Sequence, residues 1–520
     1  MSSASNLLVV SDLHLGGAVR LKYDEDNPDI TPTVPFGALR RAARLDRELS
    51  RFIEYYRDHP APDGQPWTLI FNGDIFDFLH MDVHPLETDS GGVMNEEEKL
   101  YGLAFDAKRA AFKLEVMARL HRRSLNALTS FAHHGNALVF VVGNHDVDLW
   151  FSEVRDKLVD HLADEAPDPA SVRTRIRFEP WFYYEKDCAY VEHGHRFDPY
   201  ATFPDPLKPL AADRGNQLAP NFGHFGLRYF CNRVRSFPVH DLDHLQFMDV
   251  VRWIRNHPPW YVIRAAIRFA AFVVVYAKAA LSDRFHRERR GGKVRAKRRK
   301  RIRKFAVRSG LPLNRVLALD RLRKPHVGAT LTRLAQALLL DLIGITIATV
   351  VGIIAAFWYW DGLMAWGIAI GVFSLGLLIE RWAAQTRPAI DIHPIHERMA
   401  RRIGRLTDAR VVIFGHTHVP VLQRVGRTHW LNPGSWEHLP NQKIHGADEP
   451  CDCDSRFGLV LGRGANVKPH LMRWCRQRRA VLPVASAQSA DSLVASAKSA
   501  DSLVASAQNA DSLVATSSAS

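Results

Sequence analysis

Five segments of the chain share one pattern, in which a short apolar run ends abruptly in polar side chains. The runs are LLVVSDLH from residue 7, WTLIFNGDIFD from 67, ALVFVVGNHD from 137, CAYVEHGHRFD from 188 and ARVVIFGHTH from 409. Short β-branched runs of this kind predict strands of a sheet that is covered on both faces. Helical spacing of apolar positions over 36–56 and 96–133 predicts helices between the strands. The predicted fold class is therefore α/β.

All five runs place their polar residues where the strand would end, and open α/β sheets bind ligands at the carboxyl ends of their strands. Asp12 and His14 are two residues apart, and side chains at i and i+2 of an extended segment point the same way. This pair could hold one cation. The candidate metal ligands from all five strand ends are Asp12, His14, Asp74, Asn144, His193, His416 and His418.

The chemistry of this set restricts the metal. Mixed imidazole and carboxylate donors suit Mn, Fe, Zn or Co better than Mg or Ca. Seven ligands are too many for one ion and enough for two, with Asp74 as the natural bridging carboxylate. The expected cofactor is a pair of divalent transition-metal ions, with Mn as the first choice.

More than two hundred residues separate the fourth run from the fifth, and this interval holds two long uncharged stretches, 342–360 and 362–379. Each approaches the roughly 20 residues that a helix needs to cross a bilayer. A buried hairpin in a large core is the alternative. The aromatic turn FWYWDGLMAW favours a membrane hairpin. Four glycines would suit close helix packing in lipid: Gly362, Gly367, Gly371 and Gly376.

The net charge of +14 is concentrated in one place. Residues 284–304 hold thirteen Lys or Arg and one acid, so this run supplies +12 and the rest of the chain only +2. Such a run could bind the phosphates of a nucleic acid. Because it lies near the hairpin and lacks interleaved aromatics, anionic lipid headgroups explain it at least as well.

The pattern also predicts a division of the chain. The expected parts are a catalytic domain in two pieces, a helical insertion that includes the basic run 284–304 and a hairpin at 338–380, and a tail. Their ranges are 1–204 and 401–480 for the domain, 205–400 for the insertion and 481–520 for the tail. The tail repeats SADSLVASA with a period of ten and has too little bulk to fold.

Read in order, D-x-H, G-D-x-x-D, G-N-H-D, H-G-H and G-H-T-H resemble the motif series of the calcineurin-like metallophosphoesterases, over roughly residues 5–200 and 405–475. NPGSW at 432–436 is similar to the family's turn after the last histidine pair. The resemblance implies a four-layer αββα sandwich with a dinuclear centre at one edge. It assigns Asp12, His14 and His418 to the first ion and Asn144, His193 and His416 to the second. Asp74 would be shared.

Such a centre implies hydrolysis of a phosphoester by a hydroxide that bridges two metal ions. We expect His145 to protonate the leaving oxygen, with Asp146 orienting its ring. Asp77 is expected to support the site or cap a helix rather than bind metal. His195 and Arg196 are predicted to bind substrate, although His195 could instead satisfy a loop carbonyl.

Within the family, DLHLGG, GDIFD and GHTH look most like the branch of UDP-2,3-diacylglucosamine hydrolase, which cleaves a pyrophosphate. Two departures put that substrate in doubt: His145 where Arg is usual, and the membrane insertion. The prediction is a membrane-associated hydrolase of a phosphomonoester, phosphodiester or pyrophosphate bond, acting on a lipid- or nucleotide-linked substrate. The alternatives are a nuclease and a non-catalytic interaction protein such as a retromer subunit, against which the full ligand set argues.

Charge and cysteines predict the location. Lys and Arg crowd the outer flanks of the hairpin and are absent from its turn, which places the catalytic domain in the cytoplasm of a multi-pass inner- or plasma-membrane protein. The five unevenly spaced cysteines indicate a reducing compartment. No cleavable signal is visible before the first run. Cys451 and Cys453 could bind a soft metal, but two isolated thiols are more typical of a surface loop.

Overall fold

The computed structural model describes residues 6–17, 19, 36–85, 91–234, 237, 252–337, 340–385, 392–436, 455–475 and 478–484. The chain divides into two compact units. The first unit comprises Met1–His195, Arg299–Leu322 and His393–Ser520, and the second comprises Arg196–Arg298 and Arg323–Ile392. The chain therefore leaves the first unit twice and returns to it twice.

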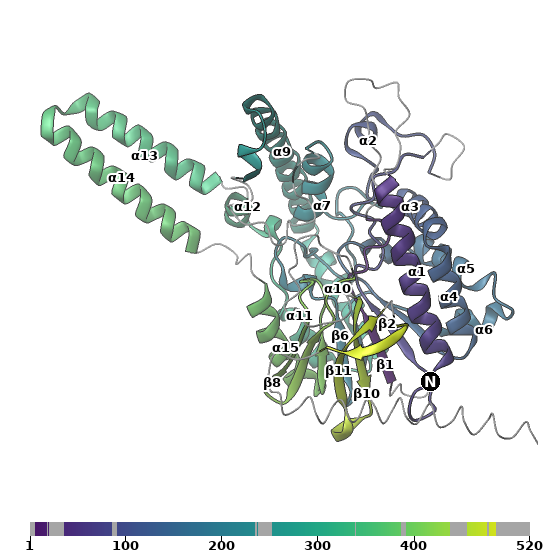
Figure 1. The fold of residues 1–520 in the computed structure, drawn as a ribbon. Coiled ribbons are helices and arrows are strands. Elements are labelled where there is room, and N and C mark those ends of the chain that lie inside the picture. Colours follow the sequence, from purple (N-terminus) through teal and green to yellow (C-terminus); the bar gives the residue numbers. More distant parts are fainter. Residues whose placement is uncertain are drawn as a thin grey trace, which may run out of the picture. The chain divides into compact units, whose positions relative to one another are not determined.

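A seven-stranded mixed sheet forms one layer of the first unit (Figure 1). Its order is β12-β11-β10-β1-β2-β3-β4, in which β1 to β4 run parallel and the other pairs are antiparallel. The strands are β1 (Asn6–Val10), β2 (Thr68–Asn72), β3 (Ala137–Val141), β4 (Ile176–Glu179), β10 (Ser455–Leu461), β11 (Lys468–Cys475) and β12 (Ala480–Pro483).

A five-stranded mixed sheet forms the next layer, in the order β5-β6-β7-β9-β8. Its parallel pairs are β6 with β7 and β7 with β9. The strands are β5 (Phe182–Glu185), β6 (Ala189–Glu192), β7 (Val411–Ile413), β8 (Val421–Val425) and β9 (Thr428–Asn432).

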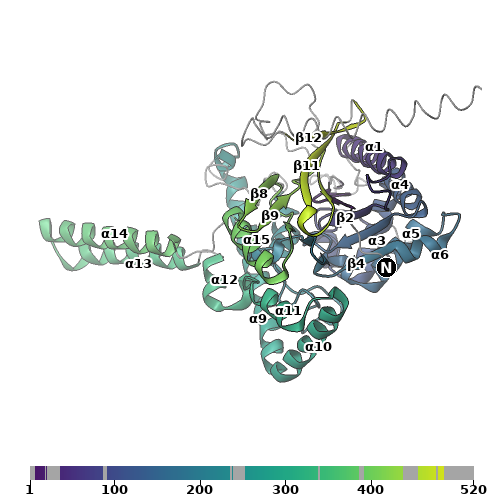
Figure 2. The same cartoon turned by 90° about the horizontal axis from the view of Figure 1, so that it is seen from below.

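The two sheets share one apolar core, because Val9, Ile70 and Val139 of the first sheet cluster with Val191 and Ile413 of the second. Helices cover the outer faces. The outer face of the seven-stranded sheet carries α1 (Phe36–Asp58) and α4 (Arg122–His133), and the five-stranded sheet carries α15 (His393–Thr407), as Figure 2 also shows. The layers of the first unit are thus helices, sheet, sheet and helices.

The predicted α/β class is confirmed, and each of the five apolar runs forms a strand that is buried along nearly its whole length. Three of these strands lie in one sheet and two in the other. The helical pattern over 96–133 proves to be three helices, α2 (Glu96–Tyr101), α3 (Ala107–Leu120) and α4. The chain turns at Gly102, whose φ of 86° suits glycine, and at His121.

Among the described residues, three helices are long and apolar enough to cross a membrane, and all three belong to the second unit: α9 (Pro259–Arg289), α13 (Leu340–Tyr359) and α14 (Gly362–Gln385). The last two form the hairpin predicted from the sequence (Figure 1). A large part of its apolar surface faces outward, including Trp358 at 81% exposure. This is consistent with association with a membrane.

The glycines of the hairpin do not all act as predicted. A Cβ at Gly376 would lie 2.3 Å from Thr349 Oγ1, so this glycine does allow close packing, as does Gly352 against Val372. Gly367 and Gly371 face open space, so that part of the prediction is wrong. Gly362 instead begins α14 with a φ of 59°.

The basic run lies mainly in α10 (Gly291–Ser309), which passes from the second unit into the first. In its last turns Ile302, Phe305 and Ala306 are buried, and the Phe305 ring stacks on Trp181 at 5.4 Å. Of the cysteines, Cys188, Cys231 and Cys475 are free and buried. Residues 451 and 453 and the repeats from 485 onward lie outside the described residues.

Candidate metal centre

The seven predicted metal ligands all lie in the first unit, in the loops that follow β1, β2, β3, β6 and β7. Six of the seven residues are buried and His418 is partly exposed. The structure brings them together in two groups whose ligand atoms lie within 4.8 Å of one another: Asp12 with His14 and His418, and Asp74 with His193 and His416.

The backbone at these strand ends is left-handed rather than extended. Positive φ angles of 48–67° occur at five of the predicted ligands: Asp12, His14, Asp74, His416 and His418. For non-glycine residues this conformation costs of the order of 1–3 kcal/mol each, and such strain clusters at functional sites. The argument that an extended backbone would aim Asp12 and His14 the same way was therefore wrong, although the two side chains do converge.

Hydrogen bonds between the loops hold this strained backbone in place. His14 N donates to Asp74 O at 2.9 Å, which ties the loop after β1 to the loop after β2. His416 N donates to the Asp12 carboxylate at 3.2 Å, which ties in the loop after β7. Gly415 allows this approach, since a Cβ there would lie 2.6 Å from Asp12 Oδ2.

In the first group, two imidazole nitrogens and the Asp12 carboxylate face one another. His14 Nδ1 lies 3.1 Å from Asp77 Oδ2 and must donate to it, because a carboxylate oxygen accepts. His14 Nε2 then carries a lone pair, 3.2 Å from His418 Nε2. His418 Nε2 in turn lies 3.3 Å from Asp12 Oδ1. These atoms can share either a proton on His418 Nε2 or a metal ion.

The second group repeats the arrangement. His193 Nδ1 donates to Asn72 O at 2.9 Å, which leaves Nε2 as the ligand atom. That nitrogen lies 3.0 Å from Asp74 Oδ2 and 3.2 Å from Asn144 Oδ1, so Asn144 joins the group. Burial lowers the pKa of His193, but the Asp74 carboxylate outweighs it and raises the pKa to about 9. The pocket therefore stabilises positive charge at Nε2, whether a proton or a metal ion.

Asp74 belongs to the second group, and its backbone is hydrogen-bonded to the first. Its carbonyl accepts from His14 N, while its carboxylate faces His193 and accepts from His145 N at 2.8 Å. A Cβ at Gly143 would lie 2.2 Å from Asp74 Oδ1, which explains the glycine before Asn144.

Asp77 forms a hub for three imidazoles. Its carboxylate accepts from the Nδ1 atoms of His14 at 3.1 Å, His80 at 2.7 Å and His145 at 3.1 Å. Burial would raise the pKa of Asp77, but the His80 and His145 imidazoles outweigh it and hold that pKa well below its usual range. Asp77 is thus a supporting group, as the sequence suggested. His14, Asp77, His80 and His145 also lie close enough together to hold a cation, although the hydrogen bonds among them already explain their arrangement.

His145 lies beside both groups, but Asp146 does not orient it. The Asp146 carboxylate accepts from Gly143 N at 2.6 Å and Ile75 N at 2.9 Å, so it braces the loop backbone. Asp77 takes the orienting role that the sequence analysis gave to Asp146. The reason is the turn after β3, which points adjacent side chains in different directions. Burial opposes protonation of His145, but Asp77 and Asp74 raise its pKa.

His80 is a site residue that sequence reasoning missed. Its ring lies 4.8 Å from the His145 ring and its side chain is buried against Asp77. The spacing Asp77-x-x-His80, within one tight turn, was the available signal.

The two predicted substrate residues fall in different units. His195 is buried, with its ring centroid 5.5 Å from that of His193. Arg196 begins the second unit, where its carbonyl accepts from Lys324 N at 3.0 Å. The NPGSW turn supports the backbone of two ligand loops. Ser435 Oγ donates to Asp12 O at 2.7 Å, and Asn432 Nδ2 donates to Gly415 O at 3.0 Å.

Comparison with models of known protein families finds no matching family, and a search of curated proteins finds no matching protein.

Proposed function

We propose that this chain is a membrane-associated phosphoesterase of the calcineurin-like type, built as an αββα sandwich around a centre for two divalent metal ions. One observation carries the proposal: side chains from five strand ends converge in two largely buried groups, six of them through ring nitrogens or carboxylates and Asn144 through its amide oxygen. Imidazole, carboxylate and amide donors that lie this close together form a donor set suited to divalent transition-metal ions.

The residues present fit two ions. Asp12, His14 and His418 would hold the first, Asn144, His193 and His416 the second, and Asp74 would serve both. Two ions of this kind, with Mn favoured by the donor set, activate a water nucleophile and neutralise charge on the phosphoryl oxygens.

His145 supplies the proton that the leaving oxygen needs. Asp77 fixes its Nδ1–H, which leaves Nε2 to face a substrate, and the raised pKa of His145 favours the protonated ring. His80 and His14 pack around the same ring and limit its rotation.

The substrate class that we favour is a lipid- or nucleotide-linked phosphoester, because the same chain carries three apolar helices. A nuclease is the second candidate, favoured by the basic run. Against it, the helix that carries the run has a structural role just beyond it, where Phe305 packs in the first unit and Arg308 lies 3.4 Å from the buried Glu179.

A substrate panel tests the proposal. Full-length protein purified in detergent is given Mn²⁺ and offered UDP-linked pyrophosphates, lipid phosphates, model diesters, and single- and double-stranded DNA. We expect metal-dependent hydrolysis of the lipid- or nucleotide-linked esters and none by the Asp74→Asn protein. Cleavage of DNA alone would favour the nuclease. Failure on every ester by protein shown to contain both ions would overturn the proposal.

A further inference from the structure

The path of the chain restricts what α9 can do. Its N-terminal side connects back to His195 of the first unit, and its C-terminal side continues through α10 to Arg299, again in the first unit. That return is firmly packed, since Phe305 stacks on Trp181, and Arg315 pairs with Asp408 at 2.5 Å. A folded unit lies on one side of a membrane, so an even number of crossings separates these two points.

Within the described part of 196–298, α9 is the one helix long and apolar enough to cross. The sequence between Pro238 and Val251 includes Asp241, Asp243 and Asp249, too many charges in too short a stretch for a second span. A single available span cannot give an even number of crossings other than zero, so α9 does not cross the membrane. The hairpin of α13 and α14, by contrast, satisfies the same rule with two.

One face of α9 packs against other elements of the second unit. Phe272 and Tyr276 contact Phe222 of α7 (Phe222–Gly226) through ring centroids 5.4 Å apart. Further along, Asp283 is buried, accepts from Ala212 N at 2.6 Å and pairs with Arg287 at 2.6 Å. This face of the helix is buried in protein, so lipid cannot surround α9 on all sides.

The opposite face is an exposed apolar stripe at helical spacing. It consists of Trp260, Ile263, Ile267, Val274, Leu281 and Phe285, each at least 42% exposed. Exposed Arg264 and Lys278 lie among them, with stems long enough to reach a headgroup layer. A helix with one packed face and one apolar face edged by cations has the form of a helix that lies in a membrane interface.

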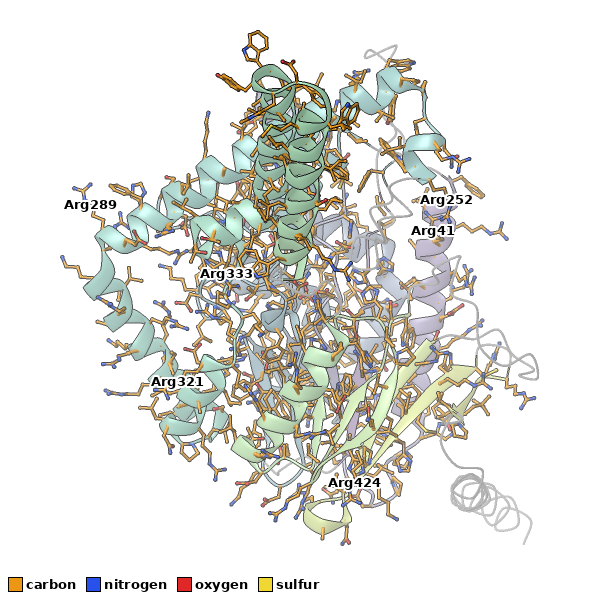
Figure 3. All side chains as sticks on the ribbon, turned by 90° about the vertical axis from the view of Figure 1, so that its left-hand side faces the viewer. Arg41, Arg252, Arg289, Arg321, Arg333 and Arg424 are labelled. Atoms are coloured by element: carbon orange, nitrogen blue, oxygen red, sulfur yellow. The ribbon has the colours of Figure 1, made fainter. Side chains whose placement is uncertain are left out.

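The C-terminal end of the stripe is strongly basic. A hollow of about 490 Å³ at the junction of α9 and α10 is lined by His286, Arg289, Arg290, Gly292 and Lys293, with no acid among them. The Arg289 side chain points away from the ribbon there (Figure 3). Charge of this sign at the end of an apolar stripe complements an anionic headgroup layer.

We propose that α9 is an in-plane membrane helix, whose stripe enters the boundary between headgroups and acyl chains of an anionic phospholipid bilayer while the basic hollow at its end takes lipid phosphates. The inference rests on the membrane association of the proposed function, but neither on its hairpin nor on its hydrolytic chemistry.

Fluorescent labels on the full-length protein test it. With Cys451 and Cys453 replaced by Ser, single cysteines at Ile263, Val274 and Leu281 carry an environment-sensitive dye. The protein is inserted in vesicles of equal amounts of phosphatidylcholine and phosphatidylglycerol. Nitroxides near the headgroup or near the acyl-chain end then report depth. Labels at Ile354 in the hairpin and Arg401 on α15 are the membrane and solvent controls.

We expect all three α9 labels to be quenched at least twofold more by the shallow nitroxide than by the deep one, with the Ile354 label showing the reverse. Deep quenching at Val274 with shallow quenching at both ends would mean that α9 crosses, which overturns the proposal. So would no quenching on α9 while Ile354 is quenched. If Ile354 alone escapes quenching, the hairpin of the proposed function fails and the α9 proposal stands.

A separate experiment tests the basic hollow. Arg289→Gln with Arg290→Gln and Lys293→Gln should reduce quenching of the Leu281 label in these vesicles to its value in pure phosphatidylcholine, and leave the Ile263 label unchanged. Unchanged quenching at Leu281 would remove the phosphate-binding part of the proposal.

Discussion

Asp77 Oδ1 lies 3.1 Å from His145 Nδ1, and the other oxygen of the same carboxylate lies 3.1 Å from Nδ1 of His14. One buried side chain therefore orients both a predicted metal ligand and the predicted proton donor. Loss of Asp77 should disturb two functions at once, whereas loss of His145 should disturb one.

This difference gives the first prediction. His145→Ala should lower kcat/KM about 10²–10⁴-fold on esters with poor leaving groups and less than about tenfold on nitrophenyl esters, because a basic leaving oxygen needs the proton most. Metal content should not change. His133→Ala, an exposed histidine elsewhere in the first unit, is the matched control. Equal losses on both ester types would contradict the role of His145.

Asp77→Asn should reproduce that leaving-group dependence and also weaken metal binding, by about 10–100-fold for a group that orients a ligand. Titration of the metal-free protein with Mn²⁺ measures the affinity, and the two ester types measure the proton donor. An Asp77→Asn protein with normal metal affinity would show that the contact with His14 has no influence on the centre.

Asp74 should behave differently from every other ligand, because in the proposed centre it serves both ions. Asp74→Asn should reduce bound metal at both positions and abolish turnover, while His418→Ala should remove mainly one ion. Elemental analysis after gel filtration checks this. The exposed Asp160→Asn serves as a control for the change in charge. Two tightly held ions in the Asp74→Asn protein would exclude a shared role.

Removal of metal should destabilise the first unit. An ion that binds these buried groups only in the folded state stabilises that state by mass action, about 2.7 kcal/mol per site at a hundredfold excess over Kd. We expect a chelator to lower the melting temperature by several degrees and Mn²⁺ to restore it. A melting temperature indifferent to chelator would indicate that the centre folds around protons instead.

The sequence was sufficient for the strands and for the polar residues that gather at their ends, because both depend on local signals. Runs such as LIF and VVI are apolar on both faces and so fit a doubly covered sheet. A polar residue directly after such a run lies at the sheet edge, wherever its partners lie in the chain. The pattern thus placed Asp12 and His418 at the same edge, and the family resemblance supplied their pairing.

The contacts of Asp77 and Asp146 could not be predicted in this way. They depend on left-handed backbone at Asp74 and on which carboxylate a turn aims at which ring, and neither has a local sequence signal. The return of Arg299–Leu322 to the first unit was hidden for another reason. Its buried residues Ile302, Phe305 and Ala306 have helical spacing, but the surrounding Lys and Arg dominate the pattern.

The last prediction concerns the side of the membrane on which the centre lies. The hairpin turn at Gly362 carries no Lys or Arg, while Arg321, Arg323, Lys324 and Arg333 precede the hairpin, so the positive-inside tendency places the first unit in the cytoplasm. A cysteine at Gly362 should react with a membrane-impermeant maleimide added to intact cells. A cysteine at Arg401 of α15, which is exposed, should react only after lysis. Reaction at Arg401 in intact cells would reverse the orientation, and release of the protein by carbonate would show that the hairpin does not span the bilayer.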